Sequence, residues 1–386
     1  MSTLVARFGA IGRNPAALAV GFVFAANGCM FANWVVRIPT VKETLGLSDG
    51  MLGLAITAMA VGGIIAMPLA GALVSRLGSA RMSVAAGMVF LLSFWLVGLA
   101  PGALTLAAAL FLAGAGNGAM DVSMNAQANA VEGATGQRIM SFAHAMFSLG
   151  LFAGTVPAGI FSASDTPVAI HLALVGAVLA AGLFLVRGSL AADAALEDPD
   201  QPSFAWPRGP LLLFGLICLC GAIVEGAMND WIAVFVEDAL HLGTVAAATA
   251  YGFFAGAMFV SRLFGDVLSE RVGPAAVVRY GLILAAAGLI VSLSGPSWSI
   301  YLGFAAVGLG IAGVFPAVFR AAGRIPGRAP GPSMASAVTL GYAGFLFGPA
   351  AIGFLADAFS LPIALAMLIP LALIGALLAS ALKLAD

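Results

Sequence analysis

The stretch NWVVRIPTVKETLGLSDG, residues 33–50, decides the fold because the second half of the chain partly repeats it. Its Asn33-Trp34 recurs as Asp230-Trp231, and its Leu45-Gly46 recurs as Leu242-Gly243, each 197 residues further on. Three glycines also recur at an offset of 194 residues: Gly150, Gly154 and Gly159 as Gly344, Gly348 and Gly353. A nearly constant offset across apolar segments predicts two similar bundles, in the same orientation, within one polypeptide.

The composition of the chain places these bundles in a lipid bilayer. Hydrophobic residues make up 62% of the 386 residues, charged residues make up 9%, and the mean hydropathy is +1.08. Because unpaired backbone groups are too costly in hydrocarbon, each apolar run that crosses the membrane is predicted to be a helix. Twelve runs are long enough to cross: 15–39, 50–74, 83–100, 103–131, 139–161, 167–187, 210–236, 245–264, 274–294, 297–320, 333–355 and 360–382.

The twelve predicted spans fall six and six around one hydrophilic stretch. The sequence therefore predicts an all-α polytopic membrane protein with an N-terminal six-helix bundle (1–188), a cytoplasmic linker (189–209) and a C-terminal six-helix bundle (210–386). Parallel repeats of this size are typical of transporters that rock one half against the other, with the substrate held between the halves. We expect the protein to be a monomer.

Basic residues predict the orientation, because Lys and Arg stay on the cytoplasmic side of a membrane. With the N-terminus inside, fourteen of the sixteen basic residues are cytoplasmic, and only Arg37 and Lys42 lie outside. Both termini are therefore predicted to be cytoplasmic. The residues assigned to the cytoplasmic side are Arg7, Arg13, Arg76, Arg81, Arg138, Arg187, Arg208, Arg262, Arg271, Arg279, Arg320, Arg324, Arg328 and Lys383.

The sequence also argues against several classes of protein. It has no Gly-x-x-x-x-Gly-Lys-Ser/Thr loop, so transport driven by its own ATPase is not predicted. The longest hydrophilic stretch has 22 residues, which is too short for an enzyme domain. Cys29, Cys218 and Cys220 fall inside predicted helices and indicate neither a disulfide framework nor a metal site. With a net charge of −1, no nucleic-acid partner is expected, and no cofactor is predicted.

Three acids lie within the predicted spans: Asp121, Glu225 and Asp230. Each costs about 2.5–3.5 kcal/mol near the bilayer centre, so a functional reason is expected for each. Asp121 and His144 lie at similar depth on consecutive spans, where an acid and an imidazole can take up and release a proton. We therefore predict that Asp121, His144 and Glu225 couple transport to protons. The alternatives are a permanent Asp121–His144 brace and a structural ion pair of Glu225.

Polar side chains recur at helical spacing and predict the lining of a solute site. Asn117, Asp121 and Asn125 recur every four residues, and amides or indoles suit a small hydroxylated solute. Amides also join transmembrane helices, and tryptophans near helix ends also form interfacial belts, so a structural role remains the alternative. The predicted substrate-binding residues are Asn27, Trp34, Asn117, Asn125, Ser148, Asn229 and Trp231.

Arg37 is one of the two basic residues on the predicted outer side. We expect it to form a gate with Asp230, Glu237 or Asp238, and the alternative is that it attracts an anionic substrate.

Two loops carry a family signature. GALVSRLG (71–78) and GDVLSERVG (265–273) resemble the Gly-x-x-x-Asp-Arg-x-Gly motif of the major facilitator superfamily and its second-half echo. The first copy has Ser75 in place of the usual Asp, and the second has Asp266 in place of the leading glycine. The resemblance implies a twelve-helix transporter fold, with cytoplasmic gating by Arg76, Glu270 and Arg271.

Within that superfamily, four segments resemble the YbjJ-like branch of the bacterial inner membrane, which is distantly similar to fucose permeases. These are NWVVRIPTVKETLGLSDGMLGLAI, GNGAMDVSMNAQANAVE, FAHAMFSLG and TLGYAGFLFGPAAIGFLAD. The resemblance implies proton-coupled movement of a sugar or similar polar metabolite across the inner membrane. Fucose permeases carry working acids on the first and fourth helices, whereas the first helix here has only Asn27 and Asn33.

The sequence therefore predicts a secondary transporter of a small polar solute, coupled to protons as a symporter. One alternative is a proton-coupled drug or metabolite antiporter, because Gly344, Gly348, Pro349 and Gly353 resemble a glycine-proline pattern of antiporters. That pattern belongs to the fifth helix in antiporters but lies in the eleventh here. A second alternative is a membrane sensor that binds a solute without moving it, although the linker is short for an output segment. An enzyme is not predicted.

Overall fold

The computed structural model describes residues 9–191, 207–325 and 330–385. All regular secondary structure in these residues is helical, and twelve helical segments are long and apolar enough to cross a membrane. The prediction of an all-α polytopic membrane protein with twelve spans is therefore confirmed. Arg7, Arg328 and residues 192–206 of the predicted linker lie outside the described residues.

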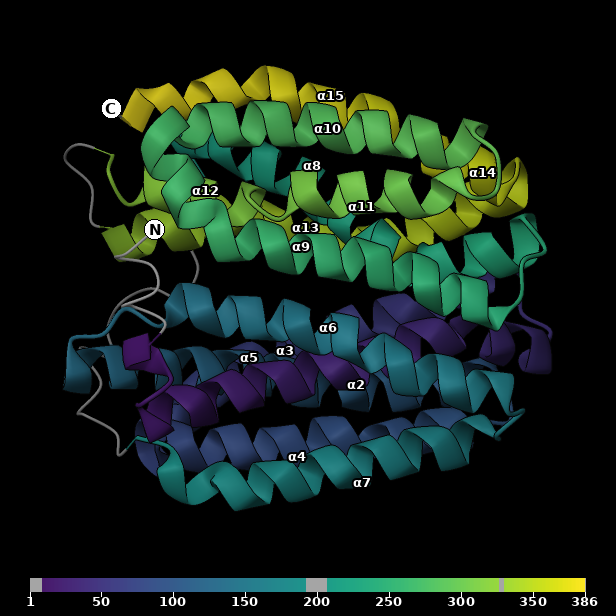
Figure 1. Cartoon of the computed structure of the whole chain (residues 1–386), viewed down its shortest axis with the longest axis horizontal. Coiled ribbons are helices and arrows are strands. Elements are labelled where there is room, and N and C mark those ends of the chain that lie inside the picture. Colours follow the sequence, from purple (N-terminus) through teal and green to yellow (C-terminus); the bar gives the residue numbers. More distant parts are fainter. Residues whose placement is uncertain (1–8, 192–206, 326–329, 386) are drawn as a thin grey trace. The chain divides into compact units, whose positions relative to one another are not determined.

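Figure 1 shows these helices along the chain. The first half contains α2 (Pro15–Leu45), α3 (Asp49–Leu77), α4 (Ser79–Gly98), α5 (Ala103–Thr135), α6 (Met140–Ala163), α7 (Val168–Val186) and η1 (Arg187–Ser189). The second half contains α8 (Pro210–Val234), η2 (Phe235–Ala239), α9 (Thr244–Val272), α10 (Pro274–Ser294), α11 (Ser299–Ile311), α12 (Val314–Ala322), α13 (Pro330–Ala358), α14 (Leu361–Ala366), α15 (Leu368–Leu378) and η3 (Ala379–Ala385).

Contacts divide the described chain into two compact units. The first unit holds residues 9–34 and 58–191, and the second holds residues 35–57 together with the described residues from 207 onward. The end of α2 and the beginning of α3 therefore fold with the helices of the second half.

The repeated glycines allow corresponding helix pairs to pack closely in the two units. In the first unit Gly150 on α6 faces α2, where an added Cβ would clash with the carbonyl oxygen of Ala25. In the second unit Gly344 on α13 faces α8, where an added Cβ would lie 2.9 Å from the Cβ of Ala222. Small residues permit this close approach between membrane helices. The duplication seen in the sequence is thus a duplication of helix packing.

Two predicted spans, 297–320 and 360–382, are interrupted rather than continuous. The first divides into α11 and α12, and the second divides into α14, α15 and η3. The break between α11 and α12 lies about one turn before Pro316, and the break between α14 and α15 lies about one turn before Pro370. A proline ring clashes with the carbonyl four residues earlier and lacks an N–H donor, so the preceding helix ends there.

The sequence analysis expects the two signature segments to be loops, but residues 71–77 belong to α3 and residues 265–272 belong to α9, so only the last glycine of each segment lies between helices. That glycine has a backbone conformation that other residues rarely adopt. Gly78 has φ of 90° and Gly273 has φ of 81°, and each is the single residue between two helices. Only glycine reaches this region without steric cost, so the two tight turns require it.

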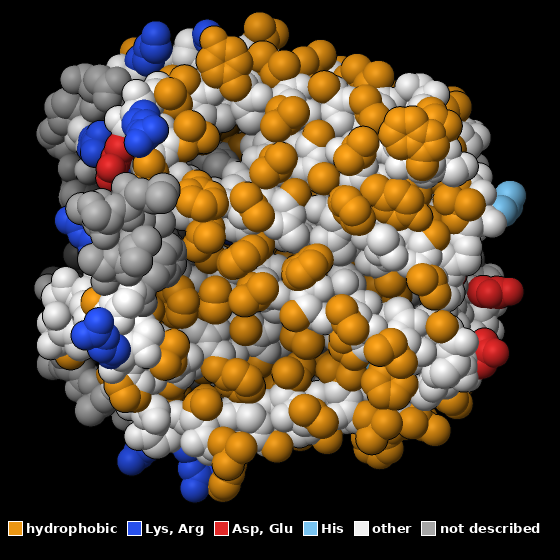
Figure 2. Space-filling view, viewed as in Figure 1, with side chains coloured by type: hydrophobic (Ala, Val, Ile, Leu, Met, Phe, Trp, Pro, Cys, Tyr) orange, Lys and Arg blue, Asp and Glu red, His pale blue; other side chains and the backbone are white. Residues whose placement is uncertain are grey.

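Hydrophobic side chains cover the middle of the helices on the face shown in Figure 2, and most Lys and Arg side chains lie toward one end. Exposed residues such as Leu104 and Leu185 are 84% and 81% accessible, as expected for a surface that contacts lipid.

Candidate functional site

Two predicted substrate-binding amides bind each other in the first unit. The Nδ2 of Asn27 on α2 donates a hydrogen bond to Oδ1 of Asn117 on α5 at 2.8 Å, and it lies 3.4 Å from the sulfur of Met120. Asn27 is buried and Asn117 is half-buried. The bond joins α2 to α5, and joining helices is the structural role that the sequence analysis gives as the alternative to solute binding. The remaining oxygen of Asn27 and amino group of Asn117 can still bind a solute.

Asp121 and Asn125, one turn apart on α5, form a local pair. Asn125 Nδ2 donates to the backbone oxygen of Asp121 at 2.8 Å and to its Oδ1 at 3.2 Å. His144 on α6 is exposed, and its ring lies edge-on to Phe24 with centroids 5.3 Å apart. The structure thus brings Asp121 to Asn125, and Ser148, one turn beyond His144, is fully buried.

Trp34 is fully buried in the first unit, where its ring packs on Phe94 with centroids 6.1 Å apart. Its indole Nε1 has no hydrogen-bond partner among the described residues. Trp34 therefore retains one unused donor.

Asn33, beside Trp34, is fully satisfied by a histidine that the sequence analysis did not single out. Its Nδ2 donates to the backbone oxygen of Cys29 at 2.8 Å, and its Oδ1 lies 2.7 Å from Nε2 of His171 on α7. Because that oxygen can only accept, Nε2 carries the hydrogen. His171 is fully buried and stacks on Phe161 with centroids 4.7 Å apart. The bond connects α2 to α7 without a formal charge.

The second unit holds an ion pair inside its helices. Nη2 of Arg262 on α9 lies 3.1 Å from Oε1 of Glu225 on α8, and their side chains are only 15% and 10% exposed. Arg262, which the sequence analysis assigns to the cytoplasmic side, lies within the apolar segment Thr244–Gly265 and reaches Glu225. The sequence analysis considers a structural ion pair of Glu225 but does not name Arg262 as the partner.

Asn229 and Tyr251 extend this polar cluster. Asn229 Nδ2 donates to the backbone oxygen of Glu225 at 3.0 Å, and the hydroxyl of Tyr251 on α9 donates to Asn229 Oδ1 at 2.8 Å. Tyr251 is fully buried, and the sequence analysis did not identify it. Its position, about two turns into α9, gave no periodic polar signal.

Asp230 and Trp231 follow on α8. Asp230 is 6% exposed, and its carboxylate has no hydrogen bond or ion pair in the part of the chain that the structure describes. Trp231 is fully buried, and its Nε1 is likewise without a partner among those residues. The two repeated tryptophans, Trp34 and Trp231, thus share the same unsatisfied donor.

The predicted outer end of the second unit carries a group of charges. Lys42 Nζ lies 2.6 Å from Asp49 Oδ1 and 2.6 Å from Asp238 Oδ2. Arg37 is buried at 3% exposure, and its charge acts on the carboxyl group of Glu237. Asp238, one predicted partner of Arg37, is therefore bound by Lys42, which the sequence analysis did not place in a gate.

The beginning of α3 is held by an acid from α13. Asp357 Oδ2 accepts hydrogen bonds from the Ser48 hydroxyl at 2.8 Å and from the Gly50 N–H at 3.0 Å. Ser48 itself caps the helix by accepting from the Met51 N–H at 3.2 Å. An acid at the positive end of a helix is favourable, so Asp357 stabilises both the helix and its contact with α13.

The three residues that the loop signature assigns to cytoplasmic gating are all exposed: Arg76, Glu270 and Arg271. The ion pairs between described residues do not include them.

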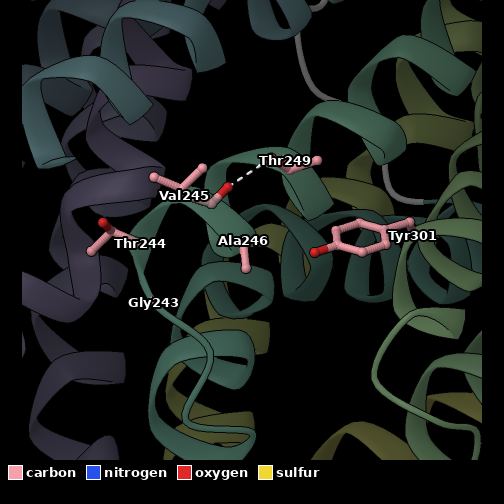
Figure 3. A pocket seen from close by; sticks show the side chains of 6 residues that line it. All are labelled: Gly243, Thr244, Val245, Ala246, Thr249 and Tyr301. Atoms are coloured by element: carbon pink, nitrogen blue, oxygen red, sulfur yellow. Dashed lines mark hydrogen bonds between the residues drawn. The ribbon is translucent and has the colours of Figure 1, made fainter.

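A hollow of about 470 Å³ lies at the beginning of α9 (Figure 3). It is lined by Gly243, Thr244, Val245, Ala246, Thr249 and Tyr301. Figure 3 shows that the Thr249 hydroxyl is already bonded to the Val245 carbonyl oxygen, at 2.7 Å. None of the predicted site residues lines this hollow, and its lining carries no charge.

Comparison with known sequences identifies transporters as relatives. The family described as Major Facilitator Superfamily matches residues 18–343. The chain is 36% identical over 347 residues to an MFS-type transporter of Yersinia pestis, and this alignment covers 88% of this chain and 89% of the relative. It is 33% identical to a transporter of Sinorhizobium fredii, over 95% of this chain and 97% of the relative. It is 31% identical to the membrane protein MosC of Rhizobium meliloti, and the match covers 95% of this chain and 89% of the relative.

Solved structures share the fold at low sequence identity. The nucleoside transporter NupG aligns with a TM-score of 0.77 at 12% identity and covers 95% of this chain and 99% of its own. A bacterial homolog of the human lysosomal transporter Spinster, in an inward-facing and unoccupied conformation, aligns with a TM-score of 0.71 at 16% identity, over 96% of each chain.

Proposed function

Because the chain belongs to the Major Facilitator Superfamily and is a multi-pass membrane transporter, we propose that it is a secondary active transporter of a small polar solute, coupled to protons as a symporter. Polar groups within the apolar helices support this proposal most directly. In α8 and α9 an ion pair, an amide and a phenol lie among side chains that are otherwise hydrophobic. Such groups are costly in a membrane and mark a solute or ion pathway.

The nature of the unused groups supports a neutral, hydroxylated solute such as a sugar. Trp34 and Trp231 each offer an indole N–H, and Asn27 and Asn117 keep part of their hydrogen-bonding capacity. An aromatic ring that packs on a sugar face and an amide that both donates and accepts are suited to such a solute. We place the protein in the cytoplasmic membrane of a bacterium with both termini inside, on the distribution of its basic residues.

We also propose that Arg37, Glu237 and Lys42 help to close the outer end during the transport cycle, with Arg76, Glu270 and Arg271 acting at the inner end. The buried guanidinium of Arg37 and the two carboxylates on Lys42 support the outer part of this proposal.

The resemblance of α13 to an antiporter pattern has a packing explanation. A Cβ added to Gly353 would clash with the carbonyl oxygen of Asp49. A Cβ added to Gly53 on α3 would lie 2.5 Å from the carbonyl oxygen of Pro349. Gly353 and Pro349 therefore serve the contact between α3 and α13, and Gly344 and Gly348 face α8, so we favour symport over export.

The proposal is tested with purified protein in lipid vesicles. Sugars, carboxylates and drugs are first screened by thermal shift, and a radiolabelled solute that raises Tm is then supplied under an imposed pH gradient. Symport predicts accumulation of the solute when the gradient drives protons inward, and loss of accumulation with a protonophore. Accumulation that requires the opposite gradient, or simple equilibration in all conditions, would contradict symport. The variant Trp231→Phe is expected to weaken solute binding, and Trp298→Phe, at a ring that is 64% exposed, is its matched control.

A further inference from the structure

The two acids of α8 differ in their partners. Glu225 is bound by Arg262 at 3.1 Å, so the pair carries no net charge. Asp230, five residues further along the same helix, is 94% buried and has no hydrogen bond or ion pair among the described residues. One acid of this helix is therefore compensated, and the other is not.

Asp230 is not completely sealed, because 6% of its surface stays exposed. A small exposed area is enough for a proton to reach or leave the carboxyl group.

The charged and titratable groups around Asp230 in this unit come from few elements. α8 supplies Glu225, and α9 supplies Tyr251 and Arg262, with the Tyr251 hydroxyl in the electrostatic field of both acids. Further along the same unit, η2 carries Glu237 and Asp238, and the end of α2 carries Arg37, whose charge acts on Glu237. Asp357, the one charged residue of α13, caps α3. Arg262 is bound by Glu225 and Lys42 holds Asp238, so neither base compensates Asp230.

An unpaired carboxylate in a membrane interior is stable only when it binds a cation. A metal ion such as Mg²⁺ or Ca²⁺ needs about six oxygen ligands, and no group of three or more His, Cys, Asp or Glu side chains among the described residues is placed to hold a metal. A proton needs one oxygen. Its addition changes the charge of the side chain from −1 to zero.

The repeat supports the same assignment. The residue that corresponds to Asp230 in the first half is Asn33, which is neutral and fully bonded to Cys29 and His171. The acid is therefore not required by the helix packing that the two halves share.

We infer that Asp230, and not Glu225, binds the coupling proton, and that Arg262 is a positioning residue that fixes Glu225 beside it. This inference rests on the proposed proton symport.

The test uses the full-length protein in vesicles and protons as the ligand. Infrared difference spectra recorded during a pH titration report the C=O stretch of protonated carboxyl groups. The titrating band is expected in the wild type, in Glu225→Gln and in Asp121→Asn, and it is expected to be lost in Asp230→Asn. Asp165→Asn is the control, because Asp165 is exposed and its positive φ of 51° suits asparagine. A band that persists in Asp230→Asn, or that disappears in Glu225→Gln, overturns the inference.

A second measurement needs no variant, in case Asp230→Asn fails to fold. Dicyclohexylcarbodiimide reacts with protonated carboxyl groups in apolar surroundings, and mass spectrometry locates the labelled peptide. Label at Asp230 that declines as the pH rises supports the inference, and label at Glu225 in its place overturns it. If Asp230 is labelled and titrates but the protein shows no proton-driven solute uptake, symport alone is refuted. If uptake is proton-driven but the infrared band is unchanged in Asp230→Asn, the assignment of Asp230 alone is refuted.

Discussion

Asn33 on α2 and Asp230 on α8 occupy corresponding positions of the repeat, and their surroundings differ in kind. Both ends of the Asn33 amide are bonded, to the Cys29 carbonyl and to His171. Asp230 has no such partner among the described residues. The first half is therefore braced at this position by neutral hydrogen bonds, while the second half keeps a charge available.

The position of Glu225 extends the comparison. Its counterpart at the same offset is Gly28, where an added Cβ would clash with the carbonyl oxygen of Phe147 on α6. The first half therefore has no room for an acid there, because α2 and α6 are in backbone contact. Duplication preserved the helix packing, but the ionisable residues diverged, and the second half holds the ion pair.

The largest effect is expected from breaking that ion pair. Arg262→Ala leaves Glu225 buried without its partner, which should destabilise the protein by about 3–5 kcal/mol. The double variant Glu225→Gln/Arg262→Gln removes both charges and should recover most of the loss. Thermal and denaturant unfolding in detergent measure both, with the exposed Arg208→Ala as control. If the double variant is as unstable as Arg262→Ala, the loss of stability does not come from the unpaired charge of Glu225.

The neutral brace of the first half should be weaker. His171→Ala leaves the Asn33 oxygen buried without a donor, at a cost of about 1–3 kcal/mol from the unmade hydrogen bond, with a further loss from the ring contact with Phe161. His171→Gln, which can still donate, should retain part of the stability. The same unfolding measurements apply. A loss larger than that of Arg262→Ala would reverse the ranking of the two centres.

The beginnings of α3 and α9 offer a second comparison of the two halves. The α3 N-terminus is capped by Ser48 and by Asp357, whereas α9 begins after Gly243 without a side-chain cap and borders the open hollow. Asp357→Ala should cost about 1 kcal/mol and should speed hydrogen exchange at the first turn of α3. Exchange at the first turn of α9 serves as the internal reference. An unchanged rate at Gly50 would mean that Ser48 alone holds the helix.

The fold could be predicted from the sequence because lipid leaves the backbone few choices and because the repeat is visible as paired motifs. The repeated glycines indicated two similar bundles, and in the structure they lie at helix contacts. The interruptions near Pro316 and Pro370 were missed because the apolar run continues through them.

The candidate site was predicted less completely, because its contacts depend on how helices rotate against each other. The polar stripe on α5 identified Asn117, but its partner Asn27 could be matched only in three dimensions. The sequence did not identify Arg262 as the partner of Glu225, because the two residues lie on different helices. It did not single out His171, the one polar side chain of α7, or Tyr251, because neither belongs to a periodic polar stripe. Helix depth placed Asp121 and His144 at a similar level, but depth alone does not give the direction of a side chain, so their pairing stays a prediction.

The smallest effect is expected at the predicted outer end, where water screens the charges. Lys42 binds Asp49 and Asp238, but the Asp238 side chain is 40% exposed, so Lys42→Ala should cost only about 0.2–1 kcal/mol. The difference from the wild type should shrink as the salt concentration is raised to about 1 M, because the ions screen exposed pairs. The Glu225–Arg262 pair is buried and should respond far less to the same salt. Unfolding of Lys42→Ala and Arg262→Ala at low and high salt therefore separates the two kinds of ion pair, and an equal salt response would contradict the distinction.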